Sequence, residues 1–174
     1  GEFKMLESSI LTINGDVYSK ISDQTELASI ATDTTTLSGK YYLANNITLS
    51  GAWTPIGASN FGGPAFTGKF NGLGHTISGL SISLSDLGNG NTDTGLFGGT
   101  RGALISNVGI IDPSITITGA STYTGALVGL AQDTNIDNSY VKSSDPTKKI
   151  TSGSYVGGLV GGFGSGTLTG AGTS

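Results

Sequence analysis

The residues that could perform acid–base chemistry are few in this sequence of 174 residues. His75 is the only histidine and Arg101 is the only arginine. Carboxylates recur in or next to expected turns, at Asp86, Asp93, Asp112, Asp133, Asp137 and Asp145. Hydrolysis of a glycosidic bond requires two facing carboxylates. The question is therefore whether the fold brings any two of these side chains together.

The spacing of the carboxylates does not predict such a pair. If positions separated by a lag of 31 stack on one another, Asp112 falls near Ser143 and Asp137 falls on Ser106. His75 lies between a tight turn and a strand in NGLGHTISGL, which favours a structural or surface role. No HExxH motif is present, so the sequence has no zinc-peptidase signature. We predict no catalytic residue and no enzyme activity, with a carbohydrate-active enzyme as the alternative.

One segment has the oxygen ligands that calcium prefers. SDLGNGNTDTG, residues 85–95, contains Asp86, Asn89, Asn91 and Asp93. It lacks the spacing of an EF-hand and has no late glutamate. A plain Gly/Asn turn is the favoured interpretation. We therefore predict no metal and no cofactor, and leave calcium binding at 86–93 open.

Composition excludes several classes of protein. The net charge is −4, and the only adjacent basic pair is Lys148–Lys149, so no basic stripe for nucleic acid is present. Cysteine is absent, which excludes disulfides and thiolate sites in this chain. No apolar run approaches the length of a membrane span. We expect no nucleic-acid partner and no membrane insertion by this fragment.

The apolar residues repeat with a period near 30. Leu96, Leu127 and Leu159 recur at lags of 31 and 32, and Ile105, Ile136 and Leu168 follow at the same lags. HTISGLSI matches ALISNVGI at a lag of 28, which places Ile77, Leu80 and Ile82 on Ile105, Val108 and Ile110. Asn107 and Asn138 occupy equivalent positions, which predicts an asparagine ladder.

The segments within each unit predict short strands and not helices. SITIT (114–118), HTISGLSIS (75–83) and NVGII (107–111) are β-rich and bounded by turn residues. None has room for the crossover helix of a βαβ unit. A period of about 30 without a helix predicts one coil of a β-solenoid, whose coils stack on one another.

The segment SYVGGLVGGF, residues 154–163, is rich in glycine, and in such a fold glycine is needed only at particular positions. Coils approach at about 4.8 Å, and corners need residues with positive φ. We expect the glycines at corners and at close backbone approaches. Both faces of the segment are apolar or bare, which predicts cover on both sides.

The N-terminal part has a different pattern. GEFKM, residues 1–5, is typical of a cloning remnant followed by a start methionine. Residues 6–36 are expected to form a cap with a short helix near 23–32, and the first strand is expected in GKYYLANNITLSG. Residues 37–174 are expected to form the solenoid, truncated within its last unit. A terminal cap covers an edge that would otherwise recruit other chains.

The motifs together resemble bacterial proteins with GLUG-type repeats. The resemblance rests on KYYLANNITLSGAWTPIG, FTGKFNGLGHTISGLSI, TGLFG, TGALVG and VGGLVG, and covers roughly residues 24–169. Such repeats occur in filamentous-haemagglutinin-like adhesins and in non-catalytic regions of immunoglobulin-A-cleaving metallopeptidases. The resemblance implies a right-handed parallel β-helix, here of about four to five coils with a short N-terminal capping helix.

The repeat motif is structural and transfers no catalytic residue. Matched position by position, the repeat core is Gly95, Leu96, Phe97 and Gly98; Leu127, Val128 and Gly129; and Gly158, Leu159, Val160 and Gly161. The middle copy departs from the pattern, because Ala126 stands where the motif has glycine. That position is therefore not expected to need a positive φ.

The resemblance implies a structural and adhesive module of a large secreted or cell-surface bacterial protein. The expected partners are a surface protein or glycan of a host or neighbouring cell, bound by the interrupting loops 57–68, 84–94 and 142–149. Alternatives are a carbohydrate-active enzyme, a sugar-binding accessory domain or an inert spacer. Self-association through the open C-terminal edge is also expected.

Overall fold

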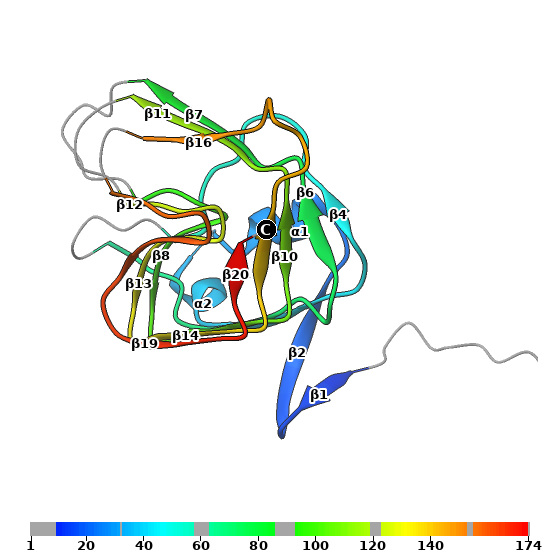
Figure 1. Cartoon of the computed structure of the whole chain (residues 1–174). Coiled ribbons are helices and arrows are strands. Elements are labelled where there is room, and N and C mark those ends of the chain that lie inside the picture. The colour runs from blue at the N-terminus through cyan, green and yellow to red at the C-terminus, as the bar shows by residue number, and fades with distance from the viewer. Residues whose placement is uncertain are drawn as a thin grey trace, which may run out of the picture.

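The computed structural model describes residues 10–31, 33–57, 63–85, 93–118, 123–152 and 155–173. These residues form a parallel β-solenoid of about four turns, which confirms the predicted fold class. Figure 1 views the stack nearly end-on, so that equivalent strands of successive coils overlie one another. The hand of the coil stays a prediction.

Short strands on each side of the coil build separate sheets. The longest sheet has the order β1-β2-β3-β5-β9-β14-β19. Its strands are β1 (Leu11–Ile13), β2 (Asp16–Ile21), β3 (Lys40–Leu43), β5 (Lys69–Asn71), β9 (Leu104–Ser106), β14 (Thr134–Asp137) and β19 (Gly166–Thr169). All of its pairings are parallel except the hairpin of β1 and β2.

Four smaller sheets form the other sides of the coil. One contains β4 (Ile47–Thr48), β6 (Thr76–Ser78), β10 (Gly109–Ile111), β15 (Tyr140–Lys142) and β20 (Gly172–Thr173). A second contains β7 (Ser81–Ser85), β11 (Ser114–Thr118) and β16 (Ile150–Thr151). The others are β8 (Phe97–Arg101), β13 (Val128–Gln132) and β18 (Val160–Phe163), and the pair β12 (Tyr123–Thr124) and β17 (Tyr155–Val156).

Two short helices follow β2. Helix α1 (Gln24–Ser29) starts where Asp23 accepts a hydrogen bond from the Glu26 amide at 2.8 Å, as expected of an N-cap. Helix α2 (Thr34–Leu37) has a capping box between Asp33 and Thr36. Leu27 and Leu37 are buried in the common core. A helix therefore lies within 23–32, and its role as a cover for the end of the stack stays a prediction.

The lags of 31 and 32 predicted from the sequence are confirmed for the later coils. Ile136 lies in register with Ile105 on one side and with Leu168 on the other. Val128 is in register with Phe97 and with Val160, which places Leu96, Leu127 and Leu159 one above another. The inward side chains of successive coils thus form one continuous apolar core.

The shorter lag predicted for the first coils is wrong. Ile77 pairs with Ile110 and not with Ile105, and Ile82 pairs with Ile115 and not with Ile110. Phe70 is the partner of Ile105. The two apolar patterns have the same internal spacing, so they match equally well when shifted by one strand. The longer corner at residues 72–75 decides the true register, because it separates Phe70 from Ile77.

Close backbone approach, and not positive φ, explains the glycines of the repeat core. A Cβ on Gly95 would lie 2.5 Å from the Gly125 carbonyl oxygen of the next coil, and one on Gly98 would clash with the Gly57 carbonyl oxygen. Neither glycine has positive φ. Several corners with positive φ carry Asn or Asp instead, at Asn107, Asp112, Asp133 and Asn138. The expected close approach of neighbouring backbones is therefore confirmed for these glycines, and the expectation that they serve corners is corrected.

The expected cover on both sides of 154–163 is also wrong. Tyr155 is 61% exposed and Val156 is 45% exposed, because this segment belongs to the last rung of the described stack. Tyr155 instead stacks on Tyr123 of the preceding coil, with ring centroids 4.8 Å apart. Leu159 is buried, so the segment is covered on its inner side only.

No helix among the described residues is long and apolar enough to cross a membrane.

Candidate functional site

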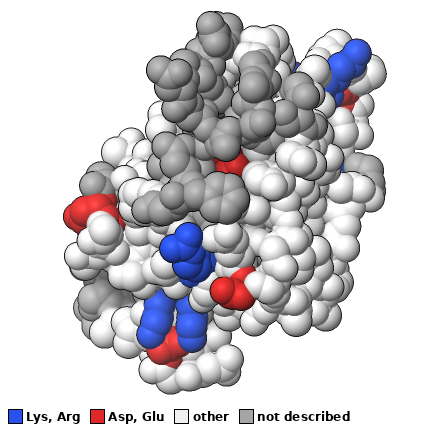
Figure 2. Space-filling view, turned by 90° about the vertical axis from the view of Figure 1, so that its left-hand side faces the viewer, with Lys and Arg blue, Asp and Glu red and all other residues white. Residues whose placement is uncertain are grey.

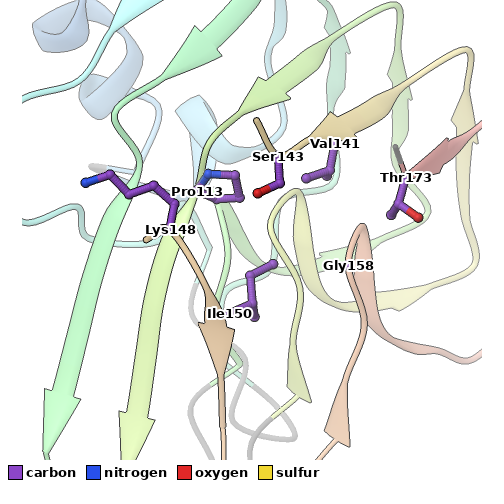
Figure 3. A pocket seen from close by; sticks show the side chains of 7 residues that line it. All are labelled: Pro113, Val141, Ser143, Lys148, Ile150, Gly158 and Thr173. Atoms are coloured by element: carbon purple, nitrogen blue, oxygen red, sulfur yellow. The ribbon is translucent and has the colours of Figure 1, made fainter. Parts of the chain in front are cut away.

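The first candidate surface is a hollow beside the predicted loop 142–149. It has a volume of about 280 Å³. Its lining residues come from several segments of the last three coils described: Pro113, Val141, Ser143, Lys148, Ile150, Gly158 and Thr173. In Figure 3 the side chain of Lys148 extends away from the hollow, while aliphatic groups of Val141 and Ile150 flank it. We call this hollow the end groove.

Loop 142–149 is fixed to the solenoid by one carboxylate. Asp112 accepts hydrogen bonds from the amides of Ser144 at 2.6 Å and Asp145 at 3.0 Å. The Asp145 and Ser144 amides lower the pKa of Asp112, because they favour its charged form. Asp145 in turn accepts from Thr147, which lowers the pKa of Asp145. These two carboxylates therefore organise the loop and do not face each other as an acid–base pair.

A second hollow involves the described end of the predicted loop 57–68. Residues Thr34, Leu37, Gly63, Pro64, Ala65, Thr67 and Arg101 line a volume of about 240 Å³. Arg101 is held by the Gln132 side chain, with a distance of 3.1 Å from Nη2 to Oε1. Residues 58–62 lie outside the described residues.

The third hollow lies under the N-terminal hairpin, and we call it the hairpin groove. Its volume is about 300 Å³. One wall is the hairpin, through Ile13, Asn14, Asp16 and Tyr18. Figure 1 shows β1 and β2 projecting beyond the outline of the coils. Asn14 and Gly15 both have positive φ, which is the geometry of a type I′ turn.

The outer face of the longest sheet forms the floor of the hairpin groove. Its contributors are Lys69, Asn71, Leu104, Ser106, Asn107 and Asp137. Those that lie on strands alternate with inward residues such as Phe70 and Ile105, so they point out of the core, while Asn107 lies at the corner after β9. The strands and the corner that follows them therefore position the side chains of the floor.

An ion-paired cluster joins the wall to the floor. The two carboxylate oxygens of Asp16 each lie 2.5 Å from an ammonium group, one of Lys40 and one of Lys69. Hydrogen bonds from Lys40 and Lys69 lower the pKa of Asp16, and the same carboxylate raises the pKa of Lys69. The hairpin is thus tied to strands β3 and β5 by two partly exposed ion pairs.

The predicted asparagine ladder is confirmed and extends by one coil. Asn138 donates to Asn107 at 2.9 Å, and Asn107 donates to Asn71 at 3.1 Å. The ladder runs along the corner beside the hairpin groove, and Asn71 and Asn107 belong to both. Sequence comparison pairs only Asn107 with Asn138, because Asn71 lies in register with Ser106 and so occupies a different position in its coil.

Asp93 is the one carboxyl group of the predicted calcium segment that the structure describes. It is 3% exposed and accepts a hydrogen bond from the Tyr123 amide at 3.3 Å. Burial raises the pKa of Asp93 to about 7, against a smaller opposing effect of that hydrogen bond. Asp86, Asn89 and Asn91 lie outside the described residues. Within the described ranges, no three His, Asp or Glu side chains gather in a way that could hold a metal.

Other residues whose side chains could bind or react have structural neighbours. His75 is partly exposed, with its Nδ1 3.3 Å from Asn46 Oδ1. Trp53 is buried and donates from Nε1 to the Leu96 carbonyl at 3.1 Å. Asp137 lies in register with Ser106, as the sequence period predicts. In the repeat core, Leu96, Phe97, Leu127 and Val128 are fully buried.

Charge is sparse on the face shown in Figure 2. Acidic and basic side chains lie singly or in small mixed groups, and most of the described surface is uncharged. The face presents no extended basic stripe, among its described residues, of the kind that tracks a nucleic-acid backbone.

The N-terminal hairpin, which forms one wall of the hairpin groove, is not among the elements predicted from the sequence. The signal was present in LTINGDVY, where Asn-Gly lies between two alternating apolar segments. The sequence pattern predicts the first strand after the helix, whereas β2 precedes the helix and pairs in parallel with β3. Only the tertiary structure shows that the hairpin lies over the sheet face.

Comparison with known proteins finds a similarity to halomucin of Haloquadratum walsbyi (strain DSM 16790 / HBSQ001). The two sequences are 31% identical over 166 residues, an alignment that covers 88% of this chain. The chain spans about 2% of the length of halomucin. No family model matches the chain, and no solved structure matches it. The chain is therefore similar to a short segment of a very long protein.

Proposed function

We propose that this chain is a structural and adhesive β-solenoid module of a large secreted or cell-surface protein. The observation that carries the proposal is the continuous stack: each coil repeats the register of the one before, around one apolar core. Such a scaffold is rigid along its length and holds loops at fixed positions on its sides. The similarity to a short segment of halomucin supports a place within a long chain.

Membership in the GLUG-type repeat proteins is part of this proposal. At Gly95, Gly98 and Gly129 the backbone of a neighbouring coil leaves no room for a Cβ atom. Close backbone packing therefore explains why the motif has glycine at these positions. Ala126 is fully buried and replaces the motif glycine without a positive φ. The motif is thus a packing device, and it supports a structural role for the repeat.

The adhesive part of the proposal assigns binding to features beside the stack. The end groove includes Ser143 and Lys148 of the predicted loop 142–149, and Asp112 holds that loop in place. Loops fixed on a rigid scaffold can present a constant surface to a partner. The proposed partners are a surface protein or a glycan of a host or neighbouring cell.

A carbohydrate-active enzyme is the second candidate, because of Asp93. A carboxyl whose pKa is about 7 can donate a proton near neutral pH, as a general acid must. Asp93 is nevertheless only 3% exposed, and its hydrogen bond from Tyr123 holds it within the stack. We favour a packing role for this side chain, and the inert spacer stays a third possibility.

A glycan array combined with a product assay tests these candidates. The adhesive module is expected to bind a subset of glycans or intact cells and to release no product from them. Variants of Ser143 and Lys148 should lower the binding. Release of oligosaccharide that disappears in D93N would establish the enzyme instead, and absence of binding to any glycan, protein extract or cell would leave the spacer.

A further inference from the structure

We propose that the hairpin groove is a binding site for one neutral, hydroxyl-rich sugar unit of a glycan. The inference names a ligand class for the adhesive role proposed above, and its biological meaning rests on that role. It places the site on the face of the longest sheet, away from the interrupting loops expected from the sequence. The site is built entirely from described residues of β1, β2, β5, β9, β14 and their turns.

Two buried residues that carry hydroxyl groups line the groove. Tyr18 is 6% exposed and Ser106 is 8% exposed. Among the hydrogen bonds formed by the described residues, none involves the side-chain hydroxyl of either residue. A hydroxyl group that lines a groove and has no protein partner can donate to a ligand and accept from it. Both positions could therefore hydrogen-bond a hydroxyl of a ligand in the groove.

The two hydroxyls approach the groove from opposite sides. Tyr18 belongs to the hairpin wall, and Ser106 belongs to the floor on β9. The Tyr18 side chain also lies near the Lys69 ammonium, and it contributes slightly to the pKa of Lys69, which Asp16 chiefly raises. A group held between wall and floor would therefore meet donors and acceptors on two sides.

The rest of the lining suits a sugar. Ile13 and Leu104 offer aliphatic surface, which complements the C–H face of a sugar ring. The exposed Asp137 carboxylate and the Asn14 amide offer further polar atoms at the rim. Small-molecule sites in proteins also combine apolar walls with a few well-placed polar groups. The smallest of them have volumes of about 300 Å³.

The charged groups around the hairpin groove favour a neutral sugar over an ion as its ligand. Both oxygens of Asp16 are occupied by Lys40 and Lys69, which disfavours a cation at that carboxylate. The same pairing occupies Lys69, the only basic residue among the described lining residues, and Asp137 adds a negative charge at the rim, which disfavours an anion. The hydroxyls of a neutral ring need no compensating charge.

The experiment is an NMR titration of the whole ¹⁵N-labelled chain with a panel of free neutral sugars. Glucose, galactose, mannose, xylose and N-acetylglucosamine are each added to about 50 mM, since one sugar unit with few contacts binds with a Kd on the order of 1 mM. At least one sugar is expected to shift the amides of Tyr18, Leu104 and Ser106 in a saturable way. No saturable shift at the groove with any of the five sugars overturns the proposal.

Matched variants separate the site from general effects. Y18F and S106A should each weaken binding about fivefold or more, because each removes one hydrogen bond to the ligand. Y42F on β3 and S83A on β7 make the same chemical changes outside the groove and should leave the Kd unchanged. Equal binding by Y18F, S106A and the wild type contradicts the assignment.

Two further measurements keep the outcome unambiguous. The melting temperature of Y18F should equal or exceed that of the wild type, because a hydroxyl without a partner adds no stability. Inorganic phosphate is titrated in parallel, and saturable shifts by phosphate in place of sugar would overturn the proposal in favour of an anion site. Because the sugars are free in solution, groove binding can succeed or fail independently of adhesion to cells or arrays.

Discussion

The carboxyl group of Asp93 is buried at a position where its charged form is unfavourable. The pKa of Asp93 rises from 3.8 to about 7 because the surrounding coils remove water from the carboxyl. Below about pH 4 this carboxyl is protonated in both the folded and the unfolded chain. As the pH rises to about 7, the unfolded state loses the proton more readily, so the free energy of unfolding falls.

We expect D93N to remove this pH dependence. At pH 8 the variant should be more stable than the wild type, by an amount that cannot exceed about 4 kcal/mol for a shift of about three pKa units. At pH 4 the two proteins should be almost equally stable. Urea denaturation at both pH values measures this, with D137N on the exposed sheet face as the control for loss of one charge. Parallel curves for wild type and D93N would contradict the burial of the charged group.

The glycines of GGLVGG differ in what a side chain would meet. A Cβ on Gly161 would collide with the Thr124 backbone of the preceding coil, which cannot move without breaking the stack. A Cβ on Gly158 would meet only the Thr173 side chain, at 2.6 Å from its methyl group, and that side chain can rotate. We expect G161V to lower the free energy of unfolding by about 2 kcal/mol or more, and G158V by less than about 1 kcal/mol.

Denaturant midpoints of the two variants, compared with the wild type, measure this difference. A cost for G158V as large as that for G161V would show that position 158 also contacts an unyielding backbone. The sequence pattern treats the two glycines alike, whereas the backbone of the neighbouring coil separates them.

At the scale of the element, the corner between the longest sheet and its neighbour is built by the asparagine ladder. Asn107 has a φ of 55° and bonds to both Asn71 and Asn138. Asparagine is favoured at such a corner because it tolerates the left-handed conformation and bridges adjacent coils. The ladder thus combines a backbone and a side-chain requirement in one residue.

Two substitutions separate these requirements. N107A should lower the free energy of unfolding by about 1–3 kcal/mol. The variant loses the ladder hydrogen bonds and places alanine, which tolerates a positive φ poorly, at this corner. N107G loses the same bonds but tolerates the φ, so its cost should be smaller. Thermal and chemical denaturation of both variants provide the measurement, and an unaltered stability of N107A would contradict the structural role of the ladder.

At the scale of the whole molecule, the last rung of the described stack exposes apolar residues that earlier rungs bury. Leu168 is 48% exposed, while Ile136, its neighbour in register, is fully buried. Phe163 is 40% exposed and, within the described stack, is paired on one side only, with Ala131. A parallel edge with unpaired amides and apolar side chains can accept a further strand.

We therefore expect this chain to self-associate with increasing concentration. Sedimentation velocity from about 10 to about 500 μM should show a growing fraction of oligomer. The double variant F163K/L168K should shift the association to higher concentration, whereas V17K on the hairpin should not. A wild type that stays monomeric throughout this range would mean that the edge does not recruit a second copy.

Much of the stack follows from the sequence, because a solenoid repeats its own local chemistry. The equivalence of Ile105 with Ile136 and of Asn107 with Asn138 can be found by comparing the chain with itself. The register of the first coils cannot, since Ile77 matches both Ile105 and Ile110 by pattern. Only pairing across the longer corner at 72–75 distinguishes the two alternatives.

The sequence by itself determined the fold class, the period and the apolar core, because these depend on which residues recur and how far apart they lie. Tertiary structure alone decided which side chains meet in the hairpin groove. That groove joins Tyr18 to Ser106 across segments that share no repeat, and the burial of Asp93 depends on the coils packed around it. Packing between distant segments sets such contacts, and no local pattern records them.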